Sequence, residues 1–395
     1  MKELIKSAVK ANAAAAKALS DDIFAHPEIA EKEYETSRKL VEMLKSHGFE
    51  VEYPFMEKEL GYGTAFRALL DCGEGPSAAI LVEYDALPGL GHACGHNLHG
   101  CMAVLAGIAL AELKGRFSGK LYVIGTPAEE DIGAKVMMSS AGVFDDMAVA
   151  IMIHCSGGIG SQAAMDLFSL RCIDVEFFGK TAHAAESPWK GQNALTAARK
   201  FMDLLDARRQ CFTPDVRLSS IVTSGGMASN IIPEYAKLRT EFRTMSMGSL
   251  EQLDDAVKKC AQAAALALDC QYKITCDTPD FYDMVRVKSL ENAVCDLFIE
   301  TDEPIVEVAT PSGSSDMGNV SYRCPAVQPM LSISDEKLAL YTAEFAQATL
   351  GEKAASALEK GAYIMAALAL RALTDEVFRN EISEDFKKSV AAKKA

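Results

Sequence analysis

The sequence predicts an α/β protein: a mixed, largely parallel sheet sandwiched by helices, with an inserted α+β domain of ferredoxin-like order. Strand and helix patterns alternate up to residue 154 and again after Phe281, which is typical of a parallel sheet covered by helices. Between these stretches the order becomes strand, helix, strand, strand, helix, strand, as in a ferredoxin-like unit. We therefore expect a first domain formed by residues 1–169 and 282–395, and an inserted domain formed by residues 170–281.

Hydrophobic periodicity predicts the elements of both domains. In the first domain we expect helices at 3–20, 32–47, 97–114, 133–140, 287–299 and 352–374, and strands at 64–71, 77–83, 119–126, 149–154 and near 305–309. In the inserted domain we expect strands at 171–178, 216–224, 234–243 and 271–276, and helices at 190–209 and 249–267. Gly48 is a plausible C-cap for the second helix.

The charge balance limits the partners of the chain. Its 55 acidic and 40 basic residues give a formal net charge of −15, whereas nucleic acids and anionic membranes are bound by basic faces. No apolar run reaches the roughly 20 residues that span a bilayer. The alanine-rich N-terminus is interrupted by lysines, which indicates a surface helix and not a signal peptide. The basic segment 387–394 is interpreted as a frayed, solvated terminus.

The cysteines indicate a reducing compartment. There are 11 of them, an odd number scattered along the chain, and this pattern argues against a disulfide framework. We expect a cytoplasmic protein in which most cysteines are small core residues.

Ligand-type residues are concentrated just after the expected strand 77–83. Within 83–100 the chain carries Glu83, Asp85, Cys94, His96 and two further histidines. Cys and His bind borderline divalent metals such as zinc, and catalytic groups of α/β sheets gather at the carboxyl ends of strands. A loop with a buried Cys and capping histidines is the alternative, but the flanking acids favour a metal site.

Two more expected strands also end in ligand-type residues. Glu129, Glu130 and Asp131 follow the strand 119–126, and His154 ends the strand 149–154. One carboxylate of the acidic run can bind a metal while its neighbour serves as general base for a metal-activated water. Alone, the acids also suit a solvated helix N-terminus, and a lone His at a strand end suits a structural role. The convergence of three strand ends favours the metal site.

A further histidine lies in the inserted domain. His183 follows its first strand in the segment Gly179–Ala185. It could donate a hydrogen bond to a developing oxyanion. An ordinary turn is the alternative, and spacing alone does not decide between the two.

Together these motifs resemble the co-catalytic metallopeptidase family that contains aminoacylases, glutamate carboxypeptidases and amidohydrolases. The chain looks like its amidohydrolase branch, which includes aminobenzoyl-glutamate hydrolases, indoleacetyl-amino-acid hydrolases and β-alanyl-lysine-type dipeptidases. The loop Gly91–Asn97 is the most specific motif. The other matching segments, in the family's order, are His26–Glu28, Glu83–Pro88, Thr126–Glu130, Gly179–Ala184, Ser229–Pro233, Arg243 and Gly313–Gly318.

The resemblance implies a role for each motif residue. It implies metal ligands at Cys94, His96, Glu130 and His154, the general base at Glu129 and, at Asp85, the acid that orients a metal ligand. The inserted domain resembles the family's lid or dimerisation domain and so implies a homodimer. There His183 would stabilise the oxyanion in a neighbouring active site, and Asn230 and Arg243 would position substrate. A structural salt bridge is the alternative for Arg243.

One position departs from the family pattern. The family supplies a last metal-binding His in a segment that reads His-Thr-x-Glu-Phe, whereas this chain has Tyr341 there and no His after His183. A phenol with an ordinary pKa of about 10 is a poor ligand. One or two divalent ions (zinc, manganese, cobalt or nickel) are therefore compatible with the sequence, and Glu83, Asp316 and Glu344 are alternative ligands.

The function expected from these features is metal-dependent hydrolysis of an amide bond in an N-acyl amino acid or dipeptide-like small molecule. Glu129 would take the proton of the attacking water. The alternative, motivated by Tyr341, is a metal-deficient, non-catalytic small-molecule binding protein on the same scaffold.

Overall fold

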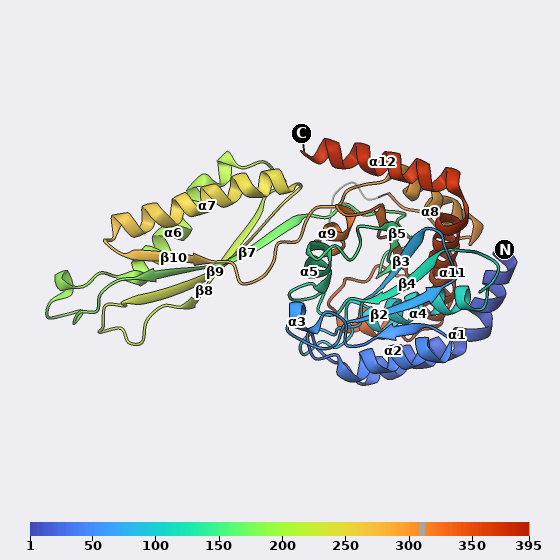
Figure 1. The fold of residues 1–395 in the computed structure, drawn as a ribbon. Helices are drawn as coiled ribbons and strands as arrows, with labels where there is room; N and C mark the ends of the chain where they lie inside the picture. The colour runs from blue at the N-terminus through green and yellow to red at the C-terminus, as the bar shows by residue number, and fades with distance from the viewer. Residues whose placement is uncertain (308–312, 395) are drawn as a thin grey trace. The chain divides into compact units, whose positions relative to one another are not determined.

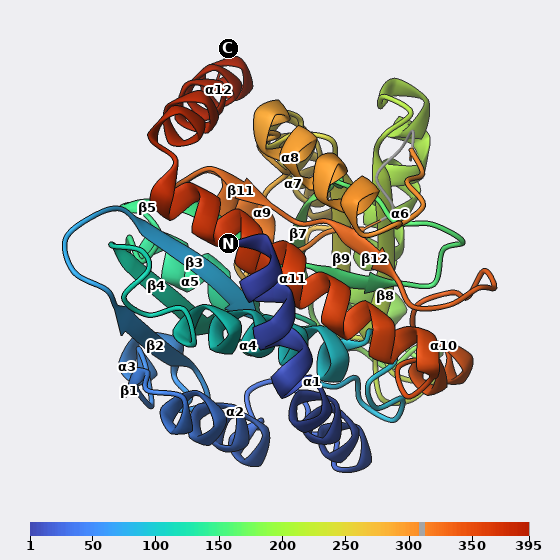
Figure 2. The ribbon, with the colours of Figure 1, turned by 90° about the vertical axis from the view of Figure 1, so that its right-hand side faces the viewer.

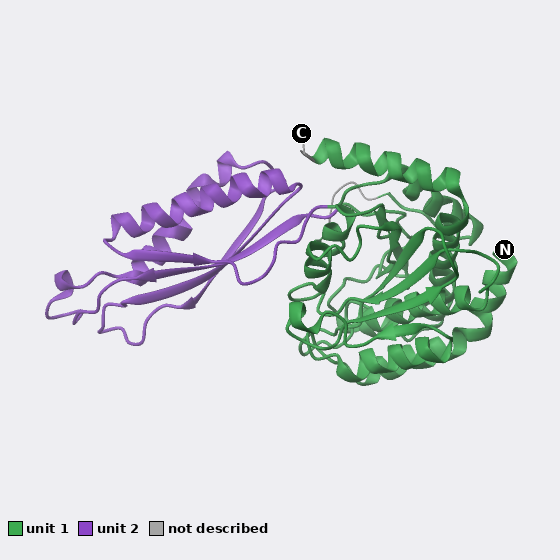
Figure 3. Ribbon diagram, in the orientation of Figure 1, with its two compact units in different colours: residues 1–166, 284–395 green, residues 167–283 purple. Residues whose placement is uncertain are grey.

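The computed structural model describes residues 1–307 and 313–394. The chain forms two compact units, the first made of Met1–Asp166 with Met284–Ala395 and the second of Leu167–Asp283 (Figure 3). The second unit begins three residues before the expected insertion 170–281 and ends two residues after it.

The first unit is built on a six-stranded sheet and a separate strand pair. Its strands are β1 (Glu50–Glu52), β2 (Phe66–Asp71), β3 (Ser77–Val82), β4 (Lys120–Gly125), β5 (Met147–Ile151), β6 (His154–Ser156), β11 (Ala326–Val327) and β12 (Met330–Ser332). The sheet order is β1-β2-β4-β3-β5-β11, and β6 pairs with β12. The strands β4, β3, β5 and β11 run parallel, while β1 and β2 form an antiparallel edge. This confirms the mixed, largely parallel sheet.

Helices cover the sheet of the first unit. They are α1 (Lys2–Ala25), α2 (Tyr34–Ser46), α3 (Glu57–Leu60), α4 (His96–Ala111), α5 (Ala134–Ser140), α8 (Lys288–Glu300), α9 (Met317–Ser321), α10 (Ala343–Ala348), α11 (Glu352–Thr374) and α12 (Glu376–Lys394). The helices α4 and α11 pack on β3, and α1 packs on both helices (Figure 2). The helices α5 and α9 lie together on the other side of the sheet (Figure 1). Nearly every side chain of α4 is buried, as expected for a helix that is apolar all round.

Two glycines let the start of α4 approach the strand ends. Gly95, the residue before the helix, has φ +85°, and a Cβ there would lie 3.0 Å from the Cβ of Cys155. A Cβ at Gly100 would lie 2.2 Å from the carbonyl oxygen of Glu83. Only glycine fits both positions, so the helix that begins with His96 is held against the end of β3.

The second unit has the predicted order of elements. It consists of β7 (Ser169–Phe178), α6 (Ala194–Arg208), β8 (Arg217–Ser224), β9 (Tyr235–Thr244), α7 (Met247–Ala267) and β10 (Gln271–Thr275), with short 3₁₀ turns at Pro188–Lys190 and Arg209–Cys211. Its sheet is antiparallel in the order β10-β7-β9-β8. Alternate residues of β7, namely Ile173, Val175 and Phe177, point into a core shared with the helices, as the two-residue period of a strand requires.

Four expectations need correction. The segment 149–154 is two strands and not one, because β5 pairs with β11 whereas β6 pairs with β12. The expected strand near 305–309 is only an isolated bridge at Ile305, and 308 and 309 lie outside the described residues. The basic terminus is helical, because Phe378 and Ile382 of α12 insert into the core and hold the helix. Only five of the 11 cysteines are buried, although all are unpaired.

In the described part of the chain, no helix combines the length and apolar character needed to cross a membrane.

Candidate metal centre

The candidate metal centre lies where parallel strands end. Val82 and Gly125, the last residues of β3 and β4, are paired with each other. The segments that follow them, beginning at Glu83 and Thr126, therefore leave the sheet at one edge, where sites of α/β sheets form. His154 begins β6 at the end of the segment that follows β5.

The structure brings the four residues proposed as metal ligands together. Cys94, His96 and Glu130 each offer a ligand atom within 4.8 Å of the others. The Sγ atom of Cys94 lies 3.3 Å from Nε2 of His154, and Nε2 of His96 lies 3.7 Å from Oε1 of Glu130. Cys94, His96 and His154 are buried.

Hydrogen bonds fix which ring nitrogen of each histidine can bind a metal. Nδ1 of His154 donates to the carbonyl oxygen of Cys155 at 2.7 Å, and Nδ1 of His96 donates to Oδ1 of Asp85 at 3.0 Å. Because Nδ1 of each ring donates to an oxygen acceptor, Nε2 is the nitrogen of each ring that is left to bind a metal. Burial lowers the pKa of His154 to about 4, so this ring is neutral, as a ligand must be.

Two buried atoms of the cluster have no hydrogen-bond partner among the described residues. These are Nε2 of His96 and Oε1 of Glu130. A buried polar atom without a partner is costly, and a divalent cation would satisfy both. The donor set of one thiol, two imidazoles and one carboxylate suits zinc and similar ions, so the residues fit the metal that the motif predicted.

Asp85 joins the two segments that carry the proposed ligands. Its Oδ1 accepts from His96, and its Oδ2 accepts from the backbone N–H of Glu130 at 3.0 Å. Burial alone would raise the pKa of Asp85, but attraction to His96 and these hydrogen bonds lower it. The carboxylate therefore stays ionised and holds the His96 ring in orientation, which supports the predicted role.

Glu129 lies beside the cluster and is partly exposed. Its carboxylate lies within 4.8 Å of those of Glu83 and Asp316. Burial raises the pKa of Glu129 well above its ordinary value, and the charges of Glu83 and Glu130 add to this. A raised pKa favours a group that must accept a proton, and a bound cation beside it would offset part of the shift.

A second group of buried ionisable residues lies behind the proposed ligands. Nζ of Lys135 donates to Oε1 of Glu83 at 2.7 Å and to Oδ1 of Asp316 at 2.5 Å. The amide of Cys155 donates to Nδ1 of His99 at 3.4 Å, so Nε2 of His99 carries the proton and donates to Oε2 of Glu83 at 3.1 Å. Both oxygens of Glu83 and both ring nitrogens of His99 thus have hydrogen-bond partners, unlike Nε2 of His96 and Oε1 of Glu130.

Three features of the site were not predicted from the sequence: Lys135, the hydrogen-bonded role of His99, and Glu33, whose Oε1 accepts from the amide of Ala128 at 2.9 Å. Lys135 is fully buried, and its only sequence signal is a single cation in the otherwise uncharged stretch 132–144. Glu344, considered as a substitute ligand, is exposed on α10.

Tyr341 reaches the site from the C-terminal part of the first unit. Its hydroxyl donates to Oε2 of Glu130 at 2.8 Å, and its amide donates to the carbonyl oxygen of Ala93 at 2.9 Å. Its φ of +64° is left-handed, an uncommon conformation for a bulky residue. Although Tyr341 is half exposed, the loss of water around its hydroxyl raises the pKa of the phenol, and the charges of Cys94 and Glu130 add to this. The residue is therefore a neutral hydrogen-bond donor to a proposed ligand.

The remaining predicted site residues belong to the second unit. The amide of Ala184, next to His183, donates to the carbonyl oxygen of Asn230 at 2.9 Å, so His183 and Asn230 lie in adjacent loops. Both are exposed. Arg243 stands near the opposite end of β9, where Nε donates to Oε1 of Glu241 at 2.8 Å. The structure therefore brings His183 and Asn230 together and places Arg243 apart from them.

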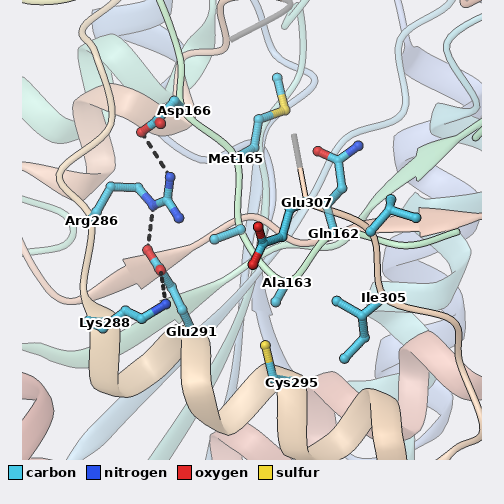
Figure 4. A pocket seen from close by; sticks show the side chains of 12 residues that line it. Gln162, Ala163, Met165, Asp166, Arg286, Lys288, Glu291, Cys295, Ile305 and Glu307 are labelled. Atoms are coloured by element: carbon cyan, nitrogen blue, oxygen red, sulfur yellow. Dashed lines mark hydrogen bonds and ion pairs between the residues drawn. The ribbon is translucent and has the colours of Figure 1, made fainter. Parts of the chain in front are cut away.

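A separate cavity of about 260 Å³ lies in the first unit (Figure 4). It is lined by residues that include Gln162, Cys295 and Arg286, and by none of the predicted site residues. Arg286 pairs with Asp166 at 2.9 Å and with Glu291. Its charge is thus already balanced by protein carboxylates.

The fold and the site together define a metal-dependent hydrolase. A cluster of thiol, imidazole and carboxylate ligands lies at the carboxyl edge of an α/β sheet, with a free acid beside it. This is what metal-assisted attack of water requires.

The family assignment agrees with this class. Residues 79–372 match the model of peptidase family M20/M25/M40, and the chain belongs to this family. The human protein named Xaa-Arg dipeptidase is 35% identical over 395 residues, which cover 94% of this chain and 88% of that protein. One of the polypeptides of the Escherichia coli p-aminobenzoyl-glutamate hydrolase is 30% identical over 301 residues, which cover 70% of this chain and 60% of that polypeptide.

Solved structures share the fold. An aminobenzoyl-glutamate utilization protein from Klebsiella pneumoniae superposes with a TM-score of 0.72 at 21% identity, covering 92% of this chain and 97% of that one. A dinuclear metal-binding M20 peptidase from Bacillus subtilis superposes with a TM-score of 0.70 at 19% identity, covering 92% and 99%. At these identities the likeness concerns the fold alone.

Proposed function

We propose that this chain hydrolyses the amide bond of a dipeptide, with Glu129 as general base beside a metal held by Cys94, His96, Glu130 and His154. The observation that carries the proposal is a pair of buried ligand atoms without a hydrogen-bond partner, Nε2 of His96 and Oε1 of Glu130, next to the carboxyl group of Glu129. The alternative of a non-catalytic binding protein is not supported, because the four proposed ligands and the proposed base lie together even though Tyr341 stands where the family has its last His.

The residues divide the chemistry among them. A bound divalent cation would polarise the amide carbonyl and acidify a water. Glu129 takes the proton of the attacking water and then delivers it to the leaving amine. Asp85 holds the ring of His96 in the orientation in which Nε2 would bind the cation. We propose that His183 donates to the developing oxyanion, with Asn230 beside it in the substrate site, and that Arg243 pairs with Glu241 in a structural role.

The relatives suggest which amide to test first. The name of the human relative, Xaa-Arg dipeptidase, points to dipeptides that end in a basic residue, whereas the Escherichia coli relative is named for p-aminobenzoyl-glutamate. The net charge of −15 favours the approach of a cationic substrate. We therefore propose a dipeptide with a C-terminal arginine or lysine.

A substrate panel tests this choice. The protein is loaded in turn with zinc, manganese, cobalt and nickel and is given Xaa-Arg, Xaa-Lys, p-aminobenzoyl-glutamate and indoleacetyl-aspartate. We expect the highest kcat/KM on the basic dipeptides, measured by release of free amino acid. Faster cleavage of the two acidic conjugates would contradict the basic-dipeptide assignment, and no cleavage of any amide would contradict the proposed function.

Tyr341 bears on the number of ions. Its hydroxyl donates a hydrogen bond to Oε2 of Glu130, and a neutral phenol does not replace an imidazole as a metal ligand. We propose that the chain therefore binds one divalent ion tightly.

We also propose that the second unit mediates a homodimer. The dimer proposal is supported by the edge strand β8, whose Ile221 and Val222 are exposed, since an open strand edge with exposed apolar side chains favours pairing with another chain.

Substituting Tyr341→His is expected to raise the metal content. An imidazole at this position adds a nitrogen ligand beside Glu130 and restores the pattern of the family. Metal per chain, measured by elemental analysis after equilibration with zinc, should increase. The matched control is Tyr341→Phe, which removes the hydroxyl without adding a ligand and should not raise the content. Equal metal in Tyr341→His and Tyr341→Phe would contradict the explanation.

A further inference from the structure

Buried carboxylates hold the backbone of the loop that carries Glu129 and Glu130. This loop, residues 126–133, joins β4 to α5. Three backbone N–H groups in or next to it donate to side-chain carboxylate oxygens. They are Ala128 to Oε1 of Glu33 at 2.9 Å, Glu130 to Oδ2 of Asp85 at 3.0 Å, and Lys135 to Oδ2 of Asp316 at 3.0 Å.

The three carboxylates come from distant parts of the chain. Glu33 precedes α2, Asp85 follows β3, and Asp316 precedes α9. All three side chains are buried. Placing an acid in a protein interior is costly unless it is hydrogen-bonded. Three buried acids that accept hydrogen bonds from the backbone of one short loop therefore indicate that they stabilise its conformation.

The loop needs such support because its backbone is strained at the residue before Glu129. Ala128 has φ +59°, a left-handed conformation that residues other than glycine rarely adopt. The second oxygen of Glu33 accepts from the hydroxyl of Thr64 at 2.9 Å. Glu33 is therefore fixed at both oxygens and holds Ala128 in the conformation that directs the next residue.

Lys135 balances the charge at the other end of the loop. Its ammonium group contacts Asp316 and Glu83, and the carboxylate of Glu129 lies within 4.8 Å of both acids. Three carboxylates this close repel one another, so a buried cation is needed to keep them together. Asp316 binds both the backbone and the ammonium of Lys135 and thereby pins the start of α5.

We propose that Glu33 and Asp316 are positioning residues for the amide hydrolysis proposed above, on which this inference rests. They clamp the two ends of the loop 126–133 and so set the direction of the Glu129 carboxylate. Neither residue is among the four proposed metal ligands, and each acts here through the loop backbone or Lys135. Their contribution therefore falls on kcat, since a base displaced by a fraction of an ångström transfers its proton less efficiently.

The test compares Glu33→Ala with Glu33→Gln. Burial, with the charge of Asp85 adding to it, raises the pKa of Glu33 to about 8, so a neutral amide is a close replacement. The glutamine oxygen can accept from Ala128, and its NH₂ can donate to the Thr64 oxygen. We expect Glu33→Ala to lower kcat by about 10- to 100-fold with little change in KM or metal content. Glu33→Gln should restore most of the rate.

Hydrogen exchange at the amide of Ala128 provides a readout that does not depend on turnover. In Glu33→Ala this amide should exchange faster, and in Glu33→Gln it should stay protected. If no substrate is cleaved at all, the proposed function fails while exchange still decides the positioning. Unchanged exchange at Ala128 in Glu33→Ala would overturn the inference.

Glu303→Ala is the matched control. Glu303 is also a buried acid, and it accepts from the hydroxyl of Ser161 at 2.7 Å, but it pairs with Lys360 and does not contact the loop. Its loss should lower stability without changing kcat or exchange at Ala128. An equal fall in kcat for Glu33→Ala and Glu303→Ala would show a merely structural effect and overturn the proposal.

If Glu33→Ala does not fold, Thr64→Val and Asp316→Asn replace it. The first removes only the hydroxyl that holds Glu33, and the second leaves Asp316 one carbonyl oxygen for the two donors of Lys135. Faster exchange at Ala128 in Thr64→Val and at Lys135 in Asp316→Asn supports the clamp. Wild-type exchange in both variants overturns it.

Discussion

Glu129→Gln is expected to lower kcat by about 100- to 10,000-fold, the range that a general base contributes. Glutamine keeps the size of the side chain but cannot accept the proton of the attacking water or return it to the leaving amine. Because Glu129 is not among the proposed metal ligands, the metal content should stay at the wild-type level. Steady-state kinetics on the best dipeptide, together with elemental analysis of the same sample, checks both expectations.

Asp131→Asn is the matched control for this prediction. Asp131 belongs to the same acidic run but is exposed, and its substitution should leave kcat unchanged. Wild-type turnover in Glu129→Gln would remove Glu129 from the mechanism. A large loss in both variants would instead indicate that the charge of the run, and not one base, supports the rate.

His96→Ala is expected to remove most of the bound metal and, with it, the activity. The substitution deletes one proposed ligand and leaves Asp85 as a buried carboxylate without its imidazole partner, which adds a penalty for an unpaired buried charge. Metal per chain after dialysis should fall close to zero, and turnover should not return at zinc concentrations that saturate the wild type.

Two further variants test whether the loss of metal in His96→Ala comes from the deleted ligand. Asp85→Asn keeps the ligand but weakens its orientation, so metal affinity should fall by about 10- to 100-fold, as for other partners of metal-bound histidines. His47→Ala removes a partly exposed histidine at the end of α2 and should change neither metal nor rate. Full metal content in His96→Ala would show that the cluster does not hold the ion as proposed.

Much of the fold was predictable from local pattern. Alternating strands and helices, and the switch in order at the inserted unit, depend on periodicity that any segment carries by itself. The errors arose where pairing partners decide the outcome. Whether 149–154 is one strand or two depends on β11 and β12, which are more than 170 residues further along the chain. The amphipathic character of α12 became informative only once Phe378 and Ile382 had a core to enter.

The candidate site divides in the same way. Cys94, His96, Glu129, Glu130 and His154 were found from the sequence because strand ends place such residues at one edge and because the loop Gly91–Asn97 is specific to the family. Glu33 and Lys135 were not found, because an isolated acid or lysine carries no signal until its partner is known. Their partners Ala128, Glu83 and Asp316 are 52 to 181 residues away.

Residue type and short spacing were enough to identify the family, the class of reaction and the side chains that can bind metal. The folded chain was needed to establish which histidine nitrogens are free, which carboxylates are already satisfied, and what Tyr341 does in place of histidine. These properties depend on hydrogen bonds between segments far apart in the sequence, which no local pattern encodes. Tyr341 donates to Glu130 across 211 residues. Because a hydroxyl stands there in place of an imidazole, we expect Tyr341→His to raise the metal content.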